Sequence, residues 1–302
     1  MRRRAGMVAA VCALVTVTAC GTAGAGSGSV SAASSGELYT MAPYEGVGAW
    51  VDVFDWTAEY NRGNPEFVAA DVDTLADLGV ETLYIQTSRY ISPHAVMEVE
   101  RLEGIIDRAH GHGMAVVGWY LPELEDVGSD LIRFTAAANL LDLDGLAVDI
   151  EPLLIGEANN VELVELTERL DAEIDGVIGG IVVPPVVTDV INTDFWPDFP
   201  WDEIRDHYDV WLPMSYWSNR PESNPYHDAE RYTRENIERL RDHVGDDAPI
   251  HNIGGISHQV DPYEVRQMVQ AARAEDALGV SFYDVVAARS NTRLIWFELM
   301  KW

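Results

Sequence analysis

Residues Leu143–Pro152 read LDGLAVDIEP, a short apolar segment that ends in carboxylates. Side chains alternate across a strand, so Ala147, Asp149 and Glu151 share one face, and the Leu, Val and Ile residues that alternate with them share the other. The apolar face has to pack beneath helices, where an isolated carboxylate would be costly to bury. The pattern therefore predicts a strand whose two carboxylates project into the interior of a parallel barrel, near its mouth.

This strand is the fourth of eight apolar segments that alternate with amphipathic ones. The expected strands are Gly46–Val53, Thr82–Gln86, Ala115–Tyr120, Gly145–Ile150, Gly180–Val183, Val210–Met214, Ile250–Ile253 and Gly279–Phe282. The expected helices lie near residues 65–78, 94–112, 128–141, 158–176, 199–207, 228–244, 261–276 and 290–302. Eight such units match the size of a (β/α)8 barrel, about 250 residues. The alternative α/β fold, an open doubly wound sheet, usually has fewer strands and a Gly-rich turn after the first, which Val53–Trp56 lacks. The sequence predicts an α/β protein with a single (β/α)8 TIM barrel over residues 37–302.

The N-terminal segment has the features of a targeting signal. Residues 1–19 combine three arginines, an apolar run too short to span a bilayer and small residues before Cys20, which is typical of a signal peptide. Residues 17–21 resemble the lipobox of bacterial lipoproteins, in which the cysteine is lipidated; the alternative is an ordinary cleaved signal with a chance cysteine. Residues 20–36, rich in Gly, Ser and Ala, would form a flexible tether. We expect a secreted protein, lipid-anchored to the outer face of the bacterial cell membrane and touching the membrane only through that anchor.

The composition excludes several classes of partner. The chain has 50 Asp and Glu against 20 Lys and Arg, a formal charge of −30, whereas binding to nucleic acid requires clustered cations. Its two cysteines, Cys12 and Cys20, both lie in the N-terminal segment, so the barrel has no thiolate metal site. No cofactor is expected, because the chain contains neither a nucleotide-binding loop nor zinc-type histidine spacing. A metal-dependent hydrolase would require several side chains to converge: Asp52, Asp149, Glu151, His251 and Asp284.

Two carboxylates close together in a barrel can perform acid catalysis. Burial and mutual repulsion should raise the pKa of one of them, so that its acid form persists near neutral pH, as cleavage of a glycosidic bond requires. Glu151, at the end of the strand, is the better acid because it can reach the cavity, and Asp149 would tune it. The alternative is a structural pair bonded to backbone amides or to an arginine.

Leu143–Glu151 resembles the fourth-strand signature of glycoside hydrolase family 18, the chitinases and their relatives, except that Ala147 replaces the innermost carboxylate. The sixth strand is similar too: Met214-Ser215-Tyr216 matches that family's Met-x-Tyr. The resemblance implies that Glu151 is the acid/base, that Asp149 orients a substrate acetamide and that Tyr216 donates a hydrogen bond to it. It also implies that the nucleophile is the N-acetyl oxygen of the substrate.

The chain departs from the family at three places. Ala147 is the first, and the second is Trp217, which stands where the family usually has Asp or Asn. The third is the eighth strand, which ends in Phe282, Tyr283 and Asp284 where the family has the tryptophan that floors the sugar site. If the substrate has no acetamide, another carboxylate at the mouth could be nucleophile or base: Asp52, Asp55 or Asp284.

Aromatic residues near the strand ends are suited to a sugar cleft, because flat rings stack on pyranose faces. They are Trp50, Trp56, Tyr84, Trp119, Tyr120 and Trp217. We expect Trp119, Tyr120 and Trp217 to contact substrate because they end strands. The other expected substrate contacts are Met214, Asp52, Tyr283 and Asp284.

The leading hypothesis is a surface-anchored glycoside hydrolase of β-linked glycans, such as chitin- or peptidoglycan-like polymers that contain N-acetylglucosamine. The second hypothesis is a non-catalytic glycan-binding lipoprotein on the same barrel, which the alanine at position 147 favours and the glutamate at position 151 disfavours. The third is the metal-dependent hydrolase. The expected partner in the first two cases is an oligo- or polysaccharide.

Overall fold

The computed structural model describes residues 40–151, 157–286 and 292–302. The predicted signal peptide, Cys20 and the tether lie outside these residues and remain predictions. None of the helices within the described ranges has the length and apolar character needed to span a bilayer.

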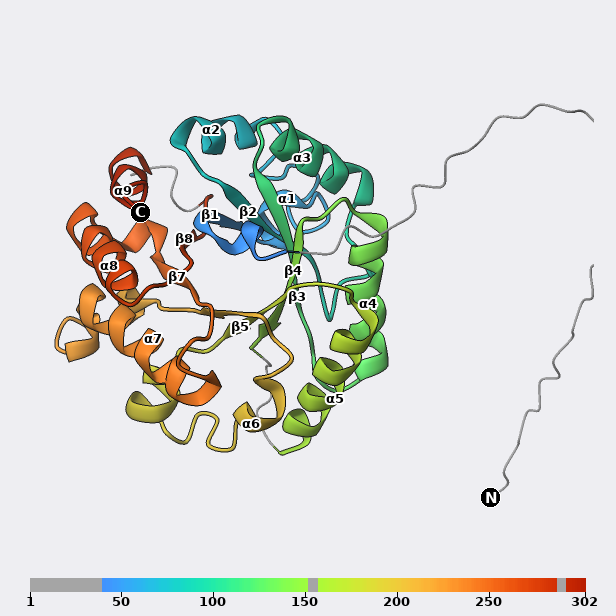
Figure 1. Cartoon of the computed structure of the whole chain (residues 1–302). Helices are drawn as coiled ribbons and strands as arrows, with labels where there is room; N and C mark the ends of the chain where they lie inside the picture. The colour runs from blue at the N-terminus through green and yellow to red at the C-terminus, as the bar shows by residue number, and fades with distance from the viewer. Residues whose placement is uncertain (1–39, 152–156, 287–291) are drawn as a thin grey trace, which may run out of the picture. The chain divides into compact units, whose positions relative to one another are not determined.

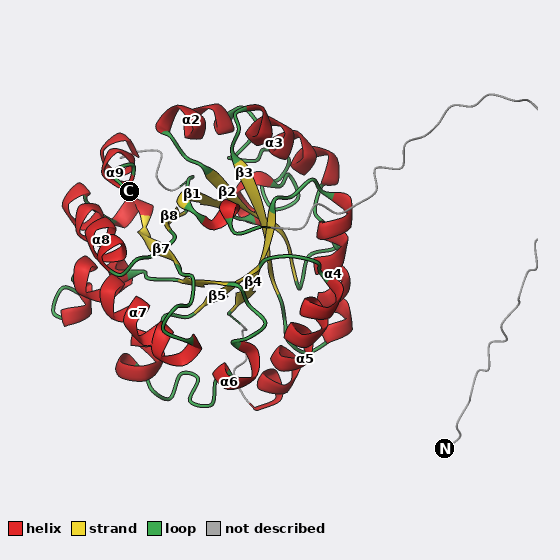
Figure 2. Ribbon diagram, in the orientation of Figure 1, coloured by secondary structure: helices red, strands yellow, loops and turns green. Residues whose placement is uncertain are grey.

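Eight parallel strands form the barrel, in the order β6-β5-β4-β3-β2-β1-β8-β7 (Figures 1 and 2). They are β1 (Gly46–Val51), β2 (Thr82–Arg89), β3 (Ala115–Leu121), β4 (Gly145–Ile150), β5 (Ile178–Val182), β6 (Val210–Pro213), β7 (His251–Ile256) and β8 (Gly279–Tyr283). Isolated parallel bridges, Trp211 to Ile250 and Met214 to Ile253, join the β6 and β7 edges. The predicted (β/α)8 fold is confirmed, with strand boundaries displaced by a few residues at most.

Helices surround the strands in Figure 1. They are α1 (Val53–Trp56), α2 (Asp71–Leu78), α3 (Val99–Gly111), α4 (Val127–Leu140), α5 (Glu157–Glu173), α6 (Trp201–Ile204), α7 (Ala229–Val244), α8 (Pro262–Ala274) and α9 (Thr292–Leu299). The sequence explains where several of them begin and end. Asp261 and Glu264 form a capping box around Pro262 at the start of α8. At the end of α2, Gly79 adopts a φ of 92°, which a residue with a Cβ rarely does.

The lower end of the barrel is filled by Tyr44, which lies just before β1. Its hydroxyl donates to the Leu146 carbonyl at 2.6 Å and accepts from the Leu146 N–H at 3.1 Å. Gly145 makes room for this ring, because a Cβ there would lie 2.9 Å from the tyrosine oxygen. His251, at the start of β7, packs beside it with Nδ1 2.8 Å from the Tyr44 carbonyl oxygen. This end of the barrel is therefore a packed core, and chemistry in such a barrel is expected at the other end, at the carboxyl ends of the strands.

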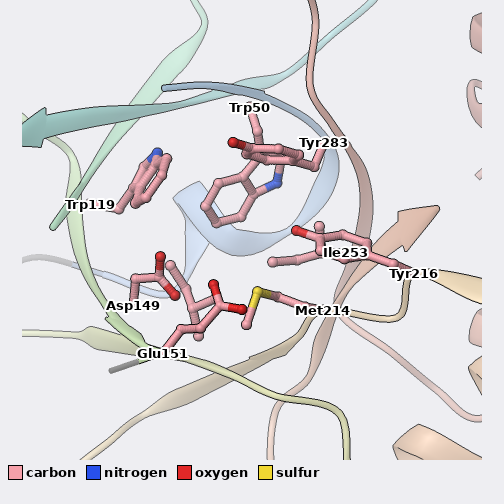
Figure 3. Close-up of a pocket in the computed structure, with 9 residues that line it drawn as sticks. Trp50, Trp119, Asp149, Glu151, Met214, Tyr216, Ile253 and Tyr283 are labelled. Atoms are coloured by element: carbon pink, nitrogen blue, oxygen red, sulfur yellow. The ribbon is translucent and has the colours of Figure 1, made fainter. Parts of the chain in front are cut away.

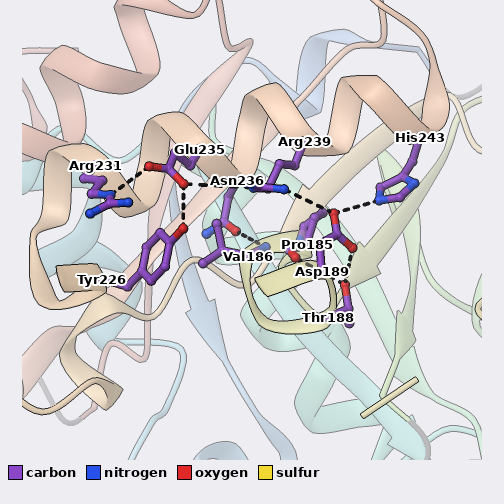
Figure 4. Close-up of polar contacts among 10 residues, drawn as sticks. All are labelled: Pro185, Val186, Thr188, Asp189, Tyr226, Arg231, Glu235, Asn236, Arg239 and His243. Atoms are coloured by element: carbon purple, nitrogen blue, oxygen red, sulfur yellow. Dashed lines mark hydrogen bonds and ion pairs between the residues drawn. The ribbon is translucent and has the colours of Figure 1, made fainter. Parts of the chain in front are cut away.

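The loops that follow β5 and β6 are held against α7 (Figure 4). Asp189 of the first loop lies 3.0 Å from Nε2 of His243. Tyr226 of the second loop donates to Glu235 at 2.7 Å. These contacts attach both loops to the outer helix layer.

Candidate active site

A cavity of about 130 Å³ lies inside the barrel at the carboxyl ends of the strands (Figure 3). Its lining residues come from seven strands or the turns that follow them: Trp50, Trp119, Asp149, Glu151, Ile181, Met214, Tyr216, Ile253 and Tyr283. The strand alternation seen in the sequence explains this set, since Asp149 and Glu151 of the fourth unit point inward as expected. The structure thus brings Asp149, Glu151, Tyr216, Trp119, Met214 and Tyr283 together, all of which were predicted to lie in the site.

Asp149 and Glu151 differ in their access to water. Asp149 is 7% exposed, and its Oδ1 is buried without a hydrogen-bond partner among the described residues. Burial raises the pKa of Asp149 well above its usual value, and the charge of Glu151 raises it further. Glu151 lies at the mouth and is exposed, yet partial removal from water raises its pKa as well. The pair can therefore retain a proton at a pH where ordinary carboxyl groups have lost theirs.

Tyr216 provides a hydroxyl group on the β6 side of the same cavity. Its pKa is raised well above the usual value, first by burial and then by the negative charges of Asp149, Glu151 and Asp284. The phenol therefore stays protonated and can donate a hydrogen bond to a bound ligand. The turn after β6 sets its position, where the Tyr216 N–H donates to the Met214 carbonyl at 2.8 Å.

Trp50 forms the floor of the cavity; the sequence placed it among the aromatic residues suited to a sugar cleft but not among the expected substrate contacts. One face of the indole stacks on Tyr84, with centroids 4.3 Å apart and planes 8° apart, and Nε1 donates to Ser281 Oγ at 2.8 Å. The edge of Trp119 meets the same ring at 5.7 Å. The signal available in the sequence was alternation, because Trp50 lies two residues after Gly48 and so on the same face of β1. In the structure that face is inward, since a Cβ on Gly48 would come within 2.5 Å of Tyr84.

Four of the predicted substrate contacts do not line this cavity: Tyr120, Trp217, Asp52 and Asp284. The first two lie elsewhere in the packing of the barrel. Tyr120 is 2% exposed and points to the opposite side of β3 from Trp119, where its hydroxyl donates to Asp130 at 2.5 Å. Trp217 is fully buried and packs close to Gly255 of β7, because the chain turns into a short 3-10 helix directly after Tyr216. Ending a strand does not by itself aim a side chain into a barrel.

The remaining predicted carboxylates gather beside the cavity, on the β1 and β8 side. Asp52 caps α1, with Oδ1 2.7 Å from the Phe54 nitrogen, and its Oδ2 accepts from the Tyr283 hydroxyl at 2.6 Å. Burial raises the pKa of Asp55 to about 8, with further contributions from Asp52 and Asp284. None of these three carboxylates is among the residues that line the cavity.

The candidate metal ligands do not form one site. His251 lies at the start of β7 against Tyr44, whereas Asp149 is near the end of β4. Within the described ranges, no group of three or more His, Cys, Asp or Glu side chains is arranged to hold a metal ion.

Similar folds occur among solved glycoside hydrolases. A family 18 chitinase from Cycas revoluta, in complex with allosamidin, has a TM-score of 0.62 at 10% identity, over 84% of this chain and 98% of that chain. A family 18 N-acetylglucosaminidase from Paenibacillus barengoltzii has a TM-score of 0.55 at 11% identity, over 85% and 99%. The glycoside hydrolase domain of PgaB (BpsB) from Bordetella bronchiseptica has a TM-score of 0.57 at 12% identity, over 85% and 98%.

The chain has the fold of the family 18 chitinases. No protein-family model matches it, and no curated protein matches its sequence. At these identities the likeness establishes the shared barrel, and the functional argument has to come from the residues of the cavity.

Proposed function

We propose that this protein is a glycoside hydrolase that cleaves β-linked glycans containing N-acetylglucosamine, with Glu151 as general acid and base. The observation that carries the proposal is the convergence of Asp149, Glu151 and Tyr216 on one cavity at the carboxyl ends of the strands. In barrels of this kind, side chains at that end perform the chemistry. The solved chitinase and N-acetylglucosaminidase with the same fold support this substrate class.

Glu151 is placed to donate the proton. It lies at the mouth, where a glycosidic oxygen can approach from solvent, and its raised pKa favours the acid form. Transfer of this proton to the leaving oxygen leaves a glutamate that can then activate water. Asp149, deeper in the cavity, interacts with Glu151 through its charge and so adjusts the proton affinity of the pair.

The arrangement of the carboxylates favours a nucleophile supplied by the substrate. Retaining glycosidases with two carboxylates place them on opposite sides of the sugar, about 5 Å apart. Here Asp149 of β4 and Glu151, directly after that strand, both enter the cavity from the fourth unit, and Asp52, Asp55 and Asp284 do not line the cavity. An acetamide on the sugar could attack the anomeric carbon from its other side, while Asp149 and Tyr216 hold its nitrogen and oxygen. This geometry selects 2-acetamido sugars.

Ala147 stands where the family resemblance places the innermost carboxylate, and the side chains around it are apolar. Ala147 is fully buried in an apolar cluster inside the barrel that includes Tyr44 and Leu212. A carboxylate here would be buried among apolar side chains, which is costly. With alanine in its place, the pKa of Asp149 is raised by its own burial and then by the charge of Glu151.

Hydrolysis of labelled N-acetylglucosamine oligosaccharides by the wild type and Glu151→Gln tests the proposal. The variant should lose at least about 100-fold in kcat, because general acid catalysis contributes that much. Glu103→Gln, on the exposed surface of α3, is the matched control and should retain full activity. Equal rates for wild type and Glu151→Gln would refute the assignment. Binding without turnover by the wild type would favour the glycan-binding alternative, for which the missing inner carboxylate at Ala147 is the supporting observation.

We also propose that the protein is anchored to the outer face of the cell membrane through lipidated Cys20. The basic start, apolar run and lipobox-like residues of the N-terminal segment support this. Labelled fatty acid should be incorporated into the full chain and not into Cys20→Ser, with Cys12→Ser as the control. Equal labelling of the wild type and Cys20→Ser would contradict the anchor.

A further inference from the structure

The hydroxyl group of Tyr283 has a fixed polarity. It donates to Asp52 Oδ2 at 2.6 Å, and Asp52 is itself held because its Oδ1 accepts from the Phe54 N–H at the start of α1. A carboxylate oxygen accepts hydrogen bonds, so the phenolic proton is directed at Asp52. The lone pairs of the Tyr283 oxygen remain to accept a hydrogen bond from a ligand in the cavity.

Tyr283 lies on the opposite side of the cavity from Asp149 and Glu151, with Trp50 between them (Figure 3). Trp50 is fixed by its stacking on Tyr84 and its bond to Ser281, so the distance across the floor is set by the core of the barrel. A sugar ring that presents its glycosidic oxygen to Glu151 would therefore lie over Trp50. Its far edge would then meet the Tyr283 oxygen.

We propose that Tyr283 is a substrate-binding residue that accepts a hydrogen bond from a free hydroxyl of the sugar in the cavity, and that Asp52 is the positioning residue that fixes this polarity. This inference rests on the proposed function and narrows its substrate class. A sugar with a donor hydroxyl at that edge is bound, and one that is deoxygenated, methylated or acylated there is disfavoured. Asp52 directly follows β1 and Tyr283 ends β8, the neighbouring strand, so the pair belongs to other units of the barrel than Glu151.

Asp52→Asn should reverse the direction of the hydrogen bond between residue 52 and Tyr283 while keeping the size and shape of the side chain. The amide oxygen can still cap α1, while the amide N–H₂ would donate to Tyr283, whose own proton would then turn toward the ligand. Tyr283→Phe removes the hydroxyl group altogether. Asp228→Asn is the matched control, because Asp228 caps α7 in the same way through the Arg231 N–H and is not among the residues that line the cavity. Thermal melting of all three checks that the fold is retained.

The readout is kcat/KM, with kcat and KM resolved, for an N-acetylglucosamine oligosaccharide and its monodeoxyfluoro analogues. Fluorine cannot donate a hydrogen bond, and its inductive effect on the reaction is the same for every variant. The wild type and Asp228→Asn should discriminate against one analogue by about 3- to 10-fold more than Asp52→Asn and Tyr283→Phe do, mostly through KM.

The same comparison is made for binding, by calorimetry, in the Glu151→Gln background. Identical discrimination in all four proteins, with the parent sugar bound or cleaved, would overturn the role of Tyr283 and leave the proposed function intact. Absence of both binding and turnover of the parent sugar would overturn the proposed function, and this assignment with it.

Discussion

His251 should make the stability of this protein depend on pH in a defined window. The imidazole is fully buried, Nδ1 lies 2.8 Å from the Tyr44 carbonyl, and Nε2 has no partner among the described residues. Burial lowers its pKa from 6.5 to about 4. The folded protein therefore holds His251 neutral where an unfolded chain would protonate it.

The size of the effect follows from this shift. Above pH 6.5 the histidine is neutral in both states and contributes no pH dependence. As pH falls toward 4, only the unfolded chain takes up the proton, so the free energy of unfolding decreases. The loss is about 2 kcal/mol at pH 5 and about 3 kcal/mol below pH 4. For a domain of this size, 2 kcal/mol corresponds to a fall in Tm of about 4 to 8 °C.

The assay compares Tm between pH 7.5 and 4.5 for the wild type and His251→Phe. The phenylalanine ring preserves the packing against Tyr84, whose centroid lies 5.2 Å from the imidazole, but it cannot titrate. The variant should be less stable at pH 7.5 and show a shallower decline on acidification. His251→Asn is a second non-titrating variant, and His258→Gln, at an exposed histidine, is the control. Parallel curves for the wild type and both His251 variants would refute the reasoning.

Three further predictions concern the core and the site. Ala147→Asp should destabilise the protein by about 3 kcal/mol or more without raising activity, because it buries a carboxylate in the apolar cluster; urea unfolding measures this. Asn236→Leu should cost about 1 to 3 kcal/mol by the same measurement, since Asn236 Oδ1 accepts from the buried Val186 N–H at 3.0 Å. The activity should persist above the ordinary pKa of a glutamic acid and fall as pH rises through the raised pKa of Glu151, which a pH–rate profile records; a fall already complete near pH 4.5 would contradict it.

Much of the fold could be read from local patterns. Each strand of the barrel was expected from an apolar run between turn residues, and the inward direction of Asp149 followed from alternation alone, because strand geometry is a local property. Alternation also explains why Tyr120 does not line the cavity: it directly follows Trp119, so the two side chains point to opposite sides of β3. Trp217 has a different cause, because it begins the short 3-10 helix that follows β6.

Other parts of the site depend on contacts between distant residues. Trp50 became the floor only because Tyr84 stacks beneath it and Ser281 binds its nitrogen, and Asp52 meets Tyr283 across 231 positions of sequence. Such pairs exist because β1 lies beside β8 in the barrel. The alternation of apolar and polar residues along the sequence does not reveal which strands become neighbours.

By itself, the sequence determined the number and order of the strand–helix units and the face of β4 that carries Asp149 and Glu151. These depend on the alternation of apolar and polar residues along a few positions. Only the tertiary structure decided which aromatic rings line the cavity, that Ala147 lies in an apolar cluster and which tyrosines line the cavity with Glu151. The reason is that closing the barrel sets how much space each inward side chain has and which partner it meets, and both depend on strands far apart in the chain.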